Sequence, residues 1–331
     1  MLFSSSWKDR LASDVLPGVP IVDARVPVTL LNLVWHRLEW PPIESLAGPV
    51  DIAHSMHPLM MPARAAARVV TIHDLYFLDH AADTATEIRR DYPELAADHA
   101  RRADGIIAVS NYTASLISNR LGVDRDRIAI CSPGGPPWAP SGRPPSGGPI
   151  LFMGTIEPRK NVATLLRAYG ELVSRRPDAP PLVLAGRVVP ACQDVLTSIR
   201  QPPLAGRVRA IGYVSGPDRE RLYRDASILV MPSLDEGFGM PAVEAMTIGL
   251  PVVVSERGAL PEVVGDAGLL IDPEDPGAIA AAIERLLCSS ELAAKLSDAG
   301  KARAARFTWT GSATRLLDAY GAAMERRRAR T

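Results

Sequence analysis

Short apolar runs alternate with amphipathic stretches through the second half of the chain, and this alternation strongly limits its possible folds. Runs without internal polar residues, of single-strand length, indicate strands buried on both faces. The pattern predicts a doubly wound, Rossmann-like parallel sheet covered by helices. The predicted strands are 149–154, 181–186, 208–213, 227–233, 251–255 and 268–272, and the predicted helices are 161–173, 190–199, 217–226, one following 235 and one beginning at Pro276.

The first half is also predicted to be α/β, with fewer strands than a full Rossmann unit needs. Its predicted strands are 49–56, 68–75, 104–110 and 126–132, and its helices are 26–40 and 111–122. Between the halves, residues 132–149 contain twelve Pro or Gly among eighteen residues, which excludes a helix or a central strand. We therefore predict domains at 1–131 and 150–310, a linker at 132–149, and a C-terminal helix at 311–331 that can pack back across the linker.

Composition narrows the class of protein. The 331 residues are 47% hydrophobic and 22% charged with zero formal net charge, which argues against disorder and against recruitment of nucleic acid. The three cysteines lack disulfide or zinc spacing. No apolar run is long enough to span a membrane, and the N-terminus lacks signal-peptide order. A cytoplasmic protein is predicted. The basic end ERRRAR is interpreted as a solvated helix end, with peripheral contact at the inner face of a membrane as the alternative.

The stretch GTIEPRKN, residues 154–161, follows the first strand of the second domain. Arg159 and Lys160 lie at the start of a predicted helix, where unpaired backbone N–H groups already favour an anion. Two cations at that position indicate a diphosphate site. The alternative is structural: Arg159 would pair with Glu157 or Asp178, and Lys160 would be solvated.

The stretch DEGFGMPAVEAM, residues 235–246, places Glu236 and Glu244 eight positions apart. Gly237 and Gly239 allow the backbone to approach a ligand closely. We expect the acids to lie on the order of 12–15 Å apart, the length of a sugar–diphosphate–ribose unit. Glu244 would then hold ribose hydroxyls and Glu236 the sugar. The alternative is an ordinary N-terminal acid and a helix-surface glutamate.

His73 and Asp74 follow an apolar strand of the first half, a position where ligands collect in doubly wound sheets. A satisfied loop histidine is the equally weighted alternative. Asp124 and Asp126 form a DxD pattern without acidic companions and are interpreted as surface residues, so no metal site is predicted. The dinucleotide, P-loop, nucleophile-elbow and zinc-protease motifs are absent from the sequence.

Taken together, GTIEPRKN, the block from IGYVSG to VEAM, and PVVVSERGALPEVVGDAGLLIDPED resemble retaining glycosyltransferase family 4, also called glycosyl transferases group 1. VVTIHDL and ADGIIAVSNYTASLI resemble the matching parts of its first domain. The resemblance is nearly continuous over 149–290, and its most specific sign is the E-x7-E spacing. It implies a GT-B fold, in which two Rossmann-like domains with doubly wound parallel sheets face a cleft.

The resemblance also implies roles. Glu236 would contact the transferred sugar, Glu244 the donor ribose, and Arg159 with Lys160 the leaving diphosphate. The residues implied in catalysis are Glu236, His73, Asp74, Lys160 and Arg159, and those implied in donor binding are Gly154, Thr155, Arg159, Lys160, Gly237, Phe238, Gly239, Met240 and Glu244. Transfer would retain the anomeric configuration by front-face displacement, without a metal or another cofactor, and domain closure about the linker would exclude water.

Two positions depart from the family pattern. Thr155 stands where many relatives carry arginine, as in a subgroup that is often mannosyltransferases. The chain also opens at what looks like the family's second strand, LFSSSW, so the first strand and its glycine-rich loop are expected to be missing. Either the start lies further upstream, or part of the active site is lost.

The main hypothesis is a retaining hexosyltransferase that moves a hexose, with mannose as a candidate, from a nucleotide-diphosphate sugar to a glycan or lipid-linked saccharide. The alternative is a non-catalytic member of the same family that binds a nucleotide sugar or scaffolds a partner. A nucleotide-sugar epimerase with the same two-domain fold is a third, weaker hypothesis.

Overall fold

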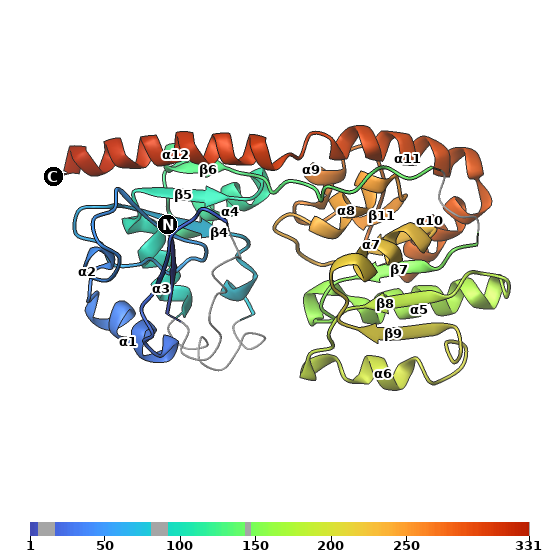
Figure 1. Ribbon diagram of the computed structural model, residues 1–331. Helices are drawn as coiled ribbons and strands as arrows, with labels where there is room; N and C mark the ends of the chain where they lie inside the picture. Colours follow the sequence, from blue (N-terminus) through green and yellow to red (C-terminus); the bar gives the residue numbers. More distant parts are fainter. Residues whose placement is uncertain (6–16, 81–91, 143–146, 331) are drawn as a thin grey trace. The chain divides into compact units, whose positions relative to one another are not determined.

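The computed structural model describes residues 1–5, 17–80, 92–142 and 147–330. It divides into two compact α/β units (Figure 1). The first comprises Met1–Val109, Ala114–Cys131 and Ala313–Thr331, and the second comprises Ser110–Thr113 and Ser132–Ser312. The described part of the expected linker thus belongs to the second unit, while its residues 143–146 lie outside the described residues.

The second unit is built on a six-stranded parallel sheet with the order β12-β11-β10-β7-β8-β9. This order is typical of a Rossmann fold, and the direction of winding switches between β7 and β10. All six strands predicted from apolar runs are confirmed. Their bounds are β7 Ile150–Met153, β8 Leu182–Ala185, β9 Val208–Gly212, β10 Ile228–Met231, β11 Val252–Ser255 and β12 Leu269–Ile271.

Helices cover both faces of this sheet, and two of them, α9 and α11, were not predicted from the sequence. The core on one side packs Leu165 and Tyr169 of α5 against Phe152 of β7, all fully buried. The helices are α5 Val162–Arg175, α6 Asp194–Ser198, α7 Gly216–Asp225, α8 Met240–Ile248, α9 Leu260–Val264, α10 Pro276–Cys288 and α11 Ser290–Ala304.

The expected linker is bonded to the second unit over its first ten residues. The backbone N–H of Ser141 donates to the Ile248 carbonyl at 3.0 Å, and Arg224 donates to the Ser141 hydroxyl at 2.6 Å. The Trp138 ring lies 5.5 Å from the ring of Tyr223, centroid to centroid. Pro and Gly do exclude regular structure here, but they do not leave these residues unattached.

The first unit contains a four-stranded parallel sheet in sequential order, β3-β4-β5-β6, and a separate parallel pair, β1-β2. The start of LFSSSW forms β1, whereas its residues 6 and 7 lie outside the described residues. The strands are β1 Leu2–Ser4, β2 Ile21–Asp23, β3 Ile52–Ser55, β4 Ala67–Ile72, β5 Gly105–Ala108 and β6 Ile128–Ile130. The helices are α1 Val28–Leu38, α2 Ile43–Ala47, α3 Tyr92–Arg102 and α4 Asn111–Leu121.

The long C-terminal helix α12, Trp309–Arg330, packs along the first unit's sheet beside β5 and β6 (Figure 1). Ala323 is buried in one cluster with residues of β4 and β5. Near the helix end, Arg330 pairs at 3.1 Å with the fully buried carboxylate of Asp104, which also accepts the backbone N–H of Arg68. Arg328, Ala329 and Arg330 are exposed, so the interpretation of the basic C-terminus as a solvated helix end is confirmed in part. What it missed is that Arg330 also pairs with a carboxylate inside the fold.

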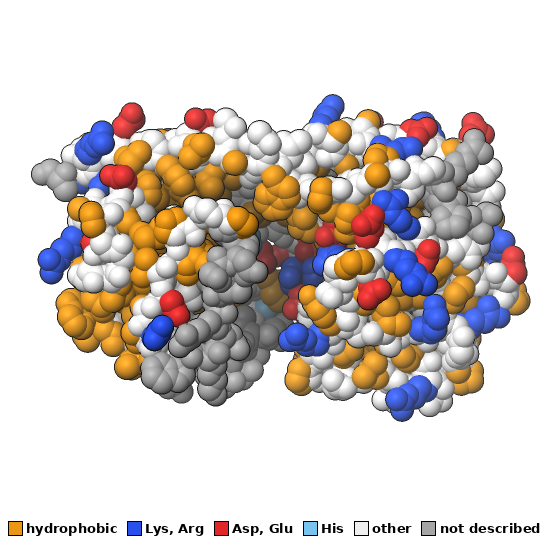
Figure 2. Space-filling view, viewed as in Figure 1, with side chains coloured by type: hydrophobic (Ala, Val, Ile, Leu, Met, Phe, Trp, Pro, Cys, Tyr) orange, Lys and Arg blue, Asp and Glu red, His pale blue; other side chains and the backbone are white. Residues whose placement is uncertain are grey.

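The surface agrees with the balanced composition. On the face drawn in Figure 2, acidic and basic side chains are interspersed over the second unit rather than gathered by sign. Within the described ranges, no helix is both long and apolar enough to cross a bilayer.

All six histidines belong to the first unit, and two are strongly perturbed. Burial lowers the pKa of His54 to about 4, with a smaller contribution from His73. Burial, then His99 and His57, lower the pKa of His36 to about 4. Between pH 6.5 and pH 4, both rings therefore stay neutral in the folded state, whereas in an unfolded chain histidine takes up a proton below its ordinary pKa of about 6.5. The stability that the two buried histidines contribute is complete above pH 6.5 and is lost as the pH falls toward 4.

We predict that a His54→Gln variant loses less stability between pH 7 and pH 5 than the wild type. Glutamine can still hydrogen-bond the Tyr320 hydroxyl and Thr71, which His54 contacts at 2.7 and 2.8 Å, but it takes up no proton. Urea unfolding at both pH values measures the difference. His80→Gln, at an exposed position, serves as the control and should behave like the wild type. An equal loss in His54→Gln and the wild type would contradict the assignment.

Candidate functional site

The two loops that carry the predicted donor site meet at the switch point of the second unit's sheet. Residues 154–161 follow β7 and residues 232–239 follow β10, and these strands are neighbours in the sheet. A backbone bond of 2.7 Å from the Leu234 N–H to the Arg159 carbonyl joins the loops. The carboxyl ends of parallel strands at a switch point are where ligands bind in open α/β sheets. The sheet order therefore places the two motifs at one ligand-binding position.

Glu236 lies at the centre of this junction, with only 5% of the residue exposed. Its Oε1 accepts a hydrogen bond from the Ser233 hydroxyl at 2.8 Å and from the Lys160 ammonium. Its Oε2 is 3.3 Å from Nη1 of Arg159. The carboxylate is thus the counter-ion of both predicted phosphate-binding cations, a pairing that sequence reasoning missed.

Arg159 has a second acidic partner. Its Nε donates to Glu157 at 2.6 Å, so this part of the structural alternative is present. Asp178, the other partner considered, pairs with Arg176 instead. Lys160 is buried rather than solvated, which contradicts the rest of that alternative. Two cations and two carboxylates form a cluster without net charge, not an isolated pair of cations.

Gly258 lies in close contact with the backbone of Glu236. Gly258 has φ +67°, and a Cβ at this position would lie 2.7 Å from the backbone N of Glu236. The next residue, Ala259, donates its N–H to the Glu236 carbonyl at 2.9 Å. One signal in the sequence could have indicated this contact, namely the glycine that follows Glu256 and Arg257 shortly after β11, but spacing alone does not show what the glycine touches.

The turn between the two acids leads into α8. Gly239 precedes the helix with φ +102°, and a Cβ there would lie 2.5 Å from Leu260. Phe238 is buried and packs edge-to-face on Phe307, with centroids 5.4 Å apart. The Phe238 side chain thus anchors the turn in the core, while the contacts expected from the backbone of Gly237 to Gly239 and from Met240, the first residue of α8, stay predictions.

Glu244 is buried on α8 and is held by two residues of α7 that sequence reasoning missed. Its Oε2 accepts from Arg219 Nη2 at 2.6 Å, from Arg219 Nε at 3.1 Å and from the Tyr223 hydroxyl at 2.6 Å. The alternative of a helix-surface glutamate is therefore wrong. Arg219 and Tyr223 are four positions apart on a predicted helix, so the sequence did place them on one face.

The two side chains that bind Glu244 keep their ordinary protonation states. Burial raises the pKa of the Tyr223 hydroxyl well above its usual value, and the neighbouring Glu244 carboxylate raises it further. Burial, the largest single influence, lowers the pKa of Arg219, but the charges and hydrogen bonds of Glu244 and Tyr223 together raise it above its ordinary value. Tyr223 is therefore a neutral donor and Arg219 a permanent cation at physiological pH.

Gly154 and Thr155 connect β7 to the loop that carries Arg159 and Lys160. The Gly154 N–H donates to the Ala185 carbonyl of β8 at 2.9 Å, and Thr155 is exposed at the strand end. His73 and Asp74 lie in the first unit, after the end of β4. His73 is exposed, with Nε2 3.2 Å from the Met56 carbonyl, and Asp74 accepts the backbone N–H of Tyr76 at 3.2 Å. Asp74 thus forms a local hydrogen bond to the backbone two residues on, and the catalytic roles of both residues stay predictions.

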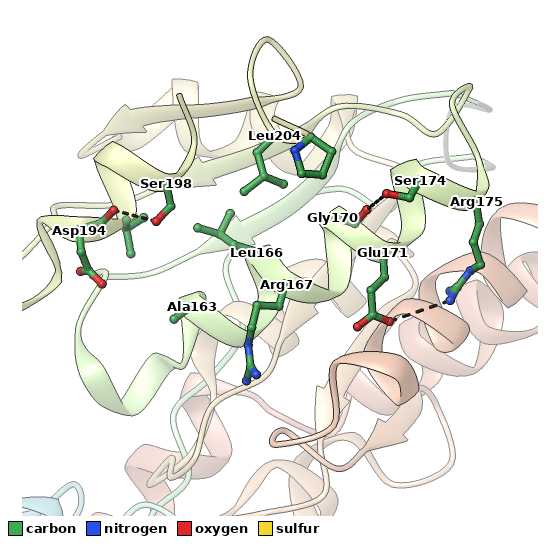
Figure 3. Close-up of a pocket in the computed structure, with 12 residues that line it drawn as sticks. Ala163, Leu166, Arg167, Gly170, Glu171, Ser174, Arg175, Asp194, Ser198 and Leu204 are labelled. Atoms are coloured by element: carbon green, nitrogen blue, oxygen red, sulfur yellow. Dashed lines mark hydrogen bonds and ion pairs between the residues drawn. The ribbon is translucent and has the colours of Figure 1, made fainter. Parts of the chain in front are cut away.

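The described residues include no group of three or more His, Cys, Asp or Glu side chains placed to hold a metal ion. A cavity of about 800 Å³ does lie in the second unit, between α5, α6 and residues 203–204 (Figure 3). Its lining includes Leu166, Leu204 and the Glu171–Arg175 ion pair. None of the predicted site residues lines it, so the buried charge cluster, rather than this cavity, is the candidate site.

Comparisons with known proteins agree with this geometry. Residues 1–135 match the model of "Glycosyltransferase Family 4" and residues 148–289 match that of "Glycosyl transferases group 1". The chain is 34% identical to O-antigen chain mannosyltransferase B of Escherichia coli, over 78% of this chain and 71% of that protein. It is 32% identical to D-inositol 3-phosphate glycosyltransferase 2 of Catenulispora acidiphila, over 85% of this chain and 67% of that protein.

A solved structure, sucrose-phosphate synthase from Thermosynechococcus elongatus, superposes with a TM-score of 0.78 at 20% identity, covering 96% of this chain and 87% of that one. Fold and sequence together define a sugar-transferring enzyme of the GT-B class. The chain belongs to glycosyltransferase family 4.

We predict that Gly258→Ala lowers kcat by about ten-fold to a hundred-fold, because the added methyl group displaces the backbone that carries Glu236. Initial rates with saturating donor measure the effect. Gly206→Ala is the matched control: Gly206 has φ +75° but no atom within 4 Å of the added Cβ. It should share the backbone strain and leave the rate unchanged. Equal rates in the two variants would contradict the supporting role of Gly258.

Proposed function

We propose that this glycosyltransferase is a metal-independent, retaining hexosyltransferase that needs no cofactor. Its donor is a nucleoside diphosphate hexose, with mannose as the first candidate, and its acceptor is a glycan or a lipid-linked saccharide. The family assignment supports the class of reaction, and the similarity to an O-antigen chain mannosyltransferase supports the choice of sugar and acceptor. Thr155 after the β7 glycine is consistent with the mannosyltransferase-like subgroup.

The Glu236–Lys160–Arg159 cluster at the switch point, in which Glu236 and Lys160 are buried, carries the proposal. An ammonium group has three N–H donors, and the bond to Glu236 uses one of those of Lys160. The remaining donors can bind the diphosphate. Because the cluster is held in place before the donor arrives, stabilising the leaving group requires little reorganisation.

Glu244 and Glu236 hold the two ends of the donor in this proposal. Both Arg219 and Tyr223 bind Oε2 of Glu244, and no bond to its Oε1 comes from the described part of the chain. That oxygen can accept hydrogen bonds from ribose hydroxyls. Glu236, fixed by Ser233 and Lys160, lies beside the transferred sugar and accepts from its hydroxyls.

The reaction then proceeds on one face of the sugar. The bond between the anomeric carbon and the diphosphate oxygen breaks while the acceptor oxygen attacks from the same side. The departing phosphate takes the acceptor's proton, so the products are the glycoside with retained configuration and a protonated nucleoside diphosphate. Lys160 and Arg159 stabilise the charge that develops on the phosphate.

Incubation with a panel of GDP-, UDP-, ADP- and dTDP-hexoses and saccharide acceptors, in buffer containing EDTA, tests the function. We expect release of the nucleoside diphosphate and, by NMR, a product with the anomeric configuration of the donor. A product of inverted configuration would rule out the retaining mechanism. Loss of transfer on addition of EDTA would rule out metal independence, and donor binding without transfer to any acceptor would favour the non-catalytic alternative.

We predict that Lys160→Gln and Glu236→Gln each lower kcat by about a hundred-fold or more, since the first removes a cation that stabilises the leaving group and the second removes the carboxylate that holds both cations in position. Glu236→Gln leaves the buried Lys160 without its carboxylate, and Lys160→Gln leaves the buried Glu236 with one cation fewer, so both variants should unfold at lower temperature than the wild type. Circular dichroism establishes that the fold persists at the assay temperature. Lys301→Gln, which breaks an ion pair with Asp298 on α11, is the matched control and should keep full activity. Wild-type turnover in both site variants would refute the assignment.

A further inference from the structure

Glu244 is held asymmetrically, and the asymmetry comes from α7. Arg219 donates two hydrogen bonds and Tyr223 one, all to Oε2, from one face of the helix. Within the described residues, no donor reaches Oε1. Because the glutamate is 8% exposed, solvent reaches this carboxylate only through a small opening. One oxygen is therefore saturated by the protein, and the other keeps its acceptor capacity.

The side chains that hold Oε2 are themselves fixed. Tyr223 is fully buried, and the Trp138 ring packs against its ring at 5.5 Å between centroids. Trp138 lies in the strap of residues 132–141, which is bonded to Ile248 and Arg224. The Tyr223 hydroxyl thus cannot turn away from Glu244 without moving the core. Arg219 presents Nε and Nη2 together to one oxygen, which restrains its rotation.

We propose that Arg219 and Tyr223 are positioning residues that clamp Oε2 of Glu244 and so present Oε1 as a fixed acceptor for the ribose hydroxyls of the donor. The inference rests on the proposed function, because it assumes that Glu244 faces the ribose. It goes beyond that function because it assigns the preference for ribose over deoxyribose nucleotides to Arg219 and Tyr223, which need not touch the donor.

A fixed acceptor discriminates more strongly than a mobile one. When a ligand lacks the hydroxyls, the nearly buried Oε1 loses its hydrogen bonds and gains none in exchange. A carboxylate that can rotate would instead turn toward water or toward another donor, and the penalty would shrink. The clamp therefore predicts a large ratio between affinities for ribose and dideoxyribose nucleotides, and it predicts that loosening the clamp reduces this ratio.

The experiment measures binding of GDP, UDP and ADP to the full chain by calorimetry, and then of the 2′,3′-dideoxy form of the tightest binder. For the wild type, we expect the dideoxy form to bind roughly ten-fold to a hundred-fold more weakly, the equivalent of one or two charge-assisted hydrogen bonds. In Tyr223→Phe and Arg219→Gln, the ratio should fall to a few-fold, because affinity for the ribose form decreases while that for the dideoxy form hardly changes. Arg219→Lys, which keeps the charge but loses the paired N–H groups, should be intermediate.

Matched controls separate positioning from general loss of stability. Tyr169→Phe removes another buried tyrosine hydroxyl of the second unit, one that donates to the Pro180 carbonyl at 2.8 Å. Arg221→Gln removes an exposed arginine from α7 that pairs only weakly with Asp225, at 3.6 Å. Both controls should keep the wild-type ratio, even if Tyr169→Phe lowers the unfolding temperature.

The possible results distinguish the inference from the function on which it rests. A wild type that binds none of the three nucleoside diphosphates would refute the proposed function and the inference with it. If the wild type binds with a large ratio that Tyr223→Phe and Arg219→Gln leave unchanged, the clamp alone is refuted. Equal weakening of both ligand forms in Arg219→Gln would also refute it, since Arg219 would then bind the diphosphate directly.

Discussion

The ion pair between Glu236 and Lys160 joins the two loops that form the candidate site. Each group is nearly buried, and each would be costly alone: breaking a buried pair by removing one partner destabilises proteins by about 3–5 kcal/mol. The pair is possible because the sheet order makes β7 and β10 neighbours, so loops about 75 residues apart in sequence leave the sheet side by side. Ser233 and the Leu234–Arg159 backbone bond then fix the geometry.

The two acids of the E-x7-E motif are stabilised in different ways. Glu236 has cations as its neighbours, and these same cations are proposed to meet the leaving group. Glu244 has a cation and a neutral hydroxyl on one oxygen only. A carboxylate with one saturated oxygen is suited to accept neutral hydroxyls, whereas one embedded among cations is suited to orient charge. The single turn between them, anchored by Phe238 in the core, keeps the two environments apart.

Much of the fold was predictable from the sequence, because apolar strands and amphipathic helices are local patterns. All six strands of the second unit follow from them, as do α5, α7, α8 and α10. Helices α9 and α11 were missed: the first has only five residues, and the second carries charged residues along much of its length. The ion pair at the basic end of α12 was not predicted, because no local pattern shows that Asp104 lies buried opposite Arg330. The loops of the candidate site were found through their place after strands, which parallel topology makes informative.

The partners within the site were not predictable in the same way. Helical spacing puts Arg219 and Tyr223 on one face of α7, but it does not say that this face meets Glu244 of α8. Likewise, the presence of a glycine after β11 does not indicate that this residue contacts the backbone of Glu236. These are contacts between different helices, strands and loops. Which residues meet depends on how the helices cross the sheet, and the sequence of a single segment does not show this. The sequence therefore predicts a candidate site and its charged residues, but not the residues that hold those charges in position.

The neutral charge balance of the site has a consequence for turnover. Two free cations would bind a diphosphate tightly in both its donor and its product form, and product release would then be slow. In the proposed site, Glu236 pairs with Lys160 and Arg159, and Glu157 pairs with Arg159, so the cations would attract the diphosphate less before reaction. As the sugar–phosphate bond breaks, negative charge accumulates on the departing oxygen, and the cations respond to that increment. The carboxylates thus weaken binding of the diphosphate in the ground state but leave the cations in position. The interaction energy of the cations is then used mainly to stabilise the transition state.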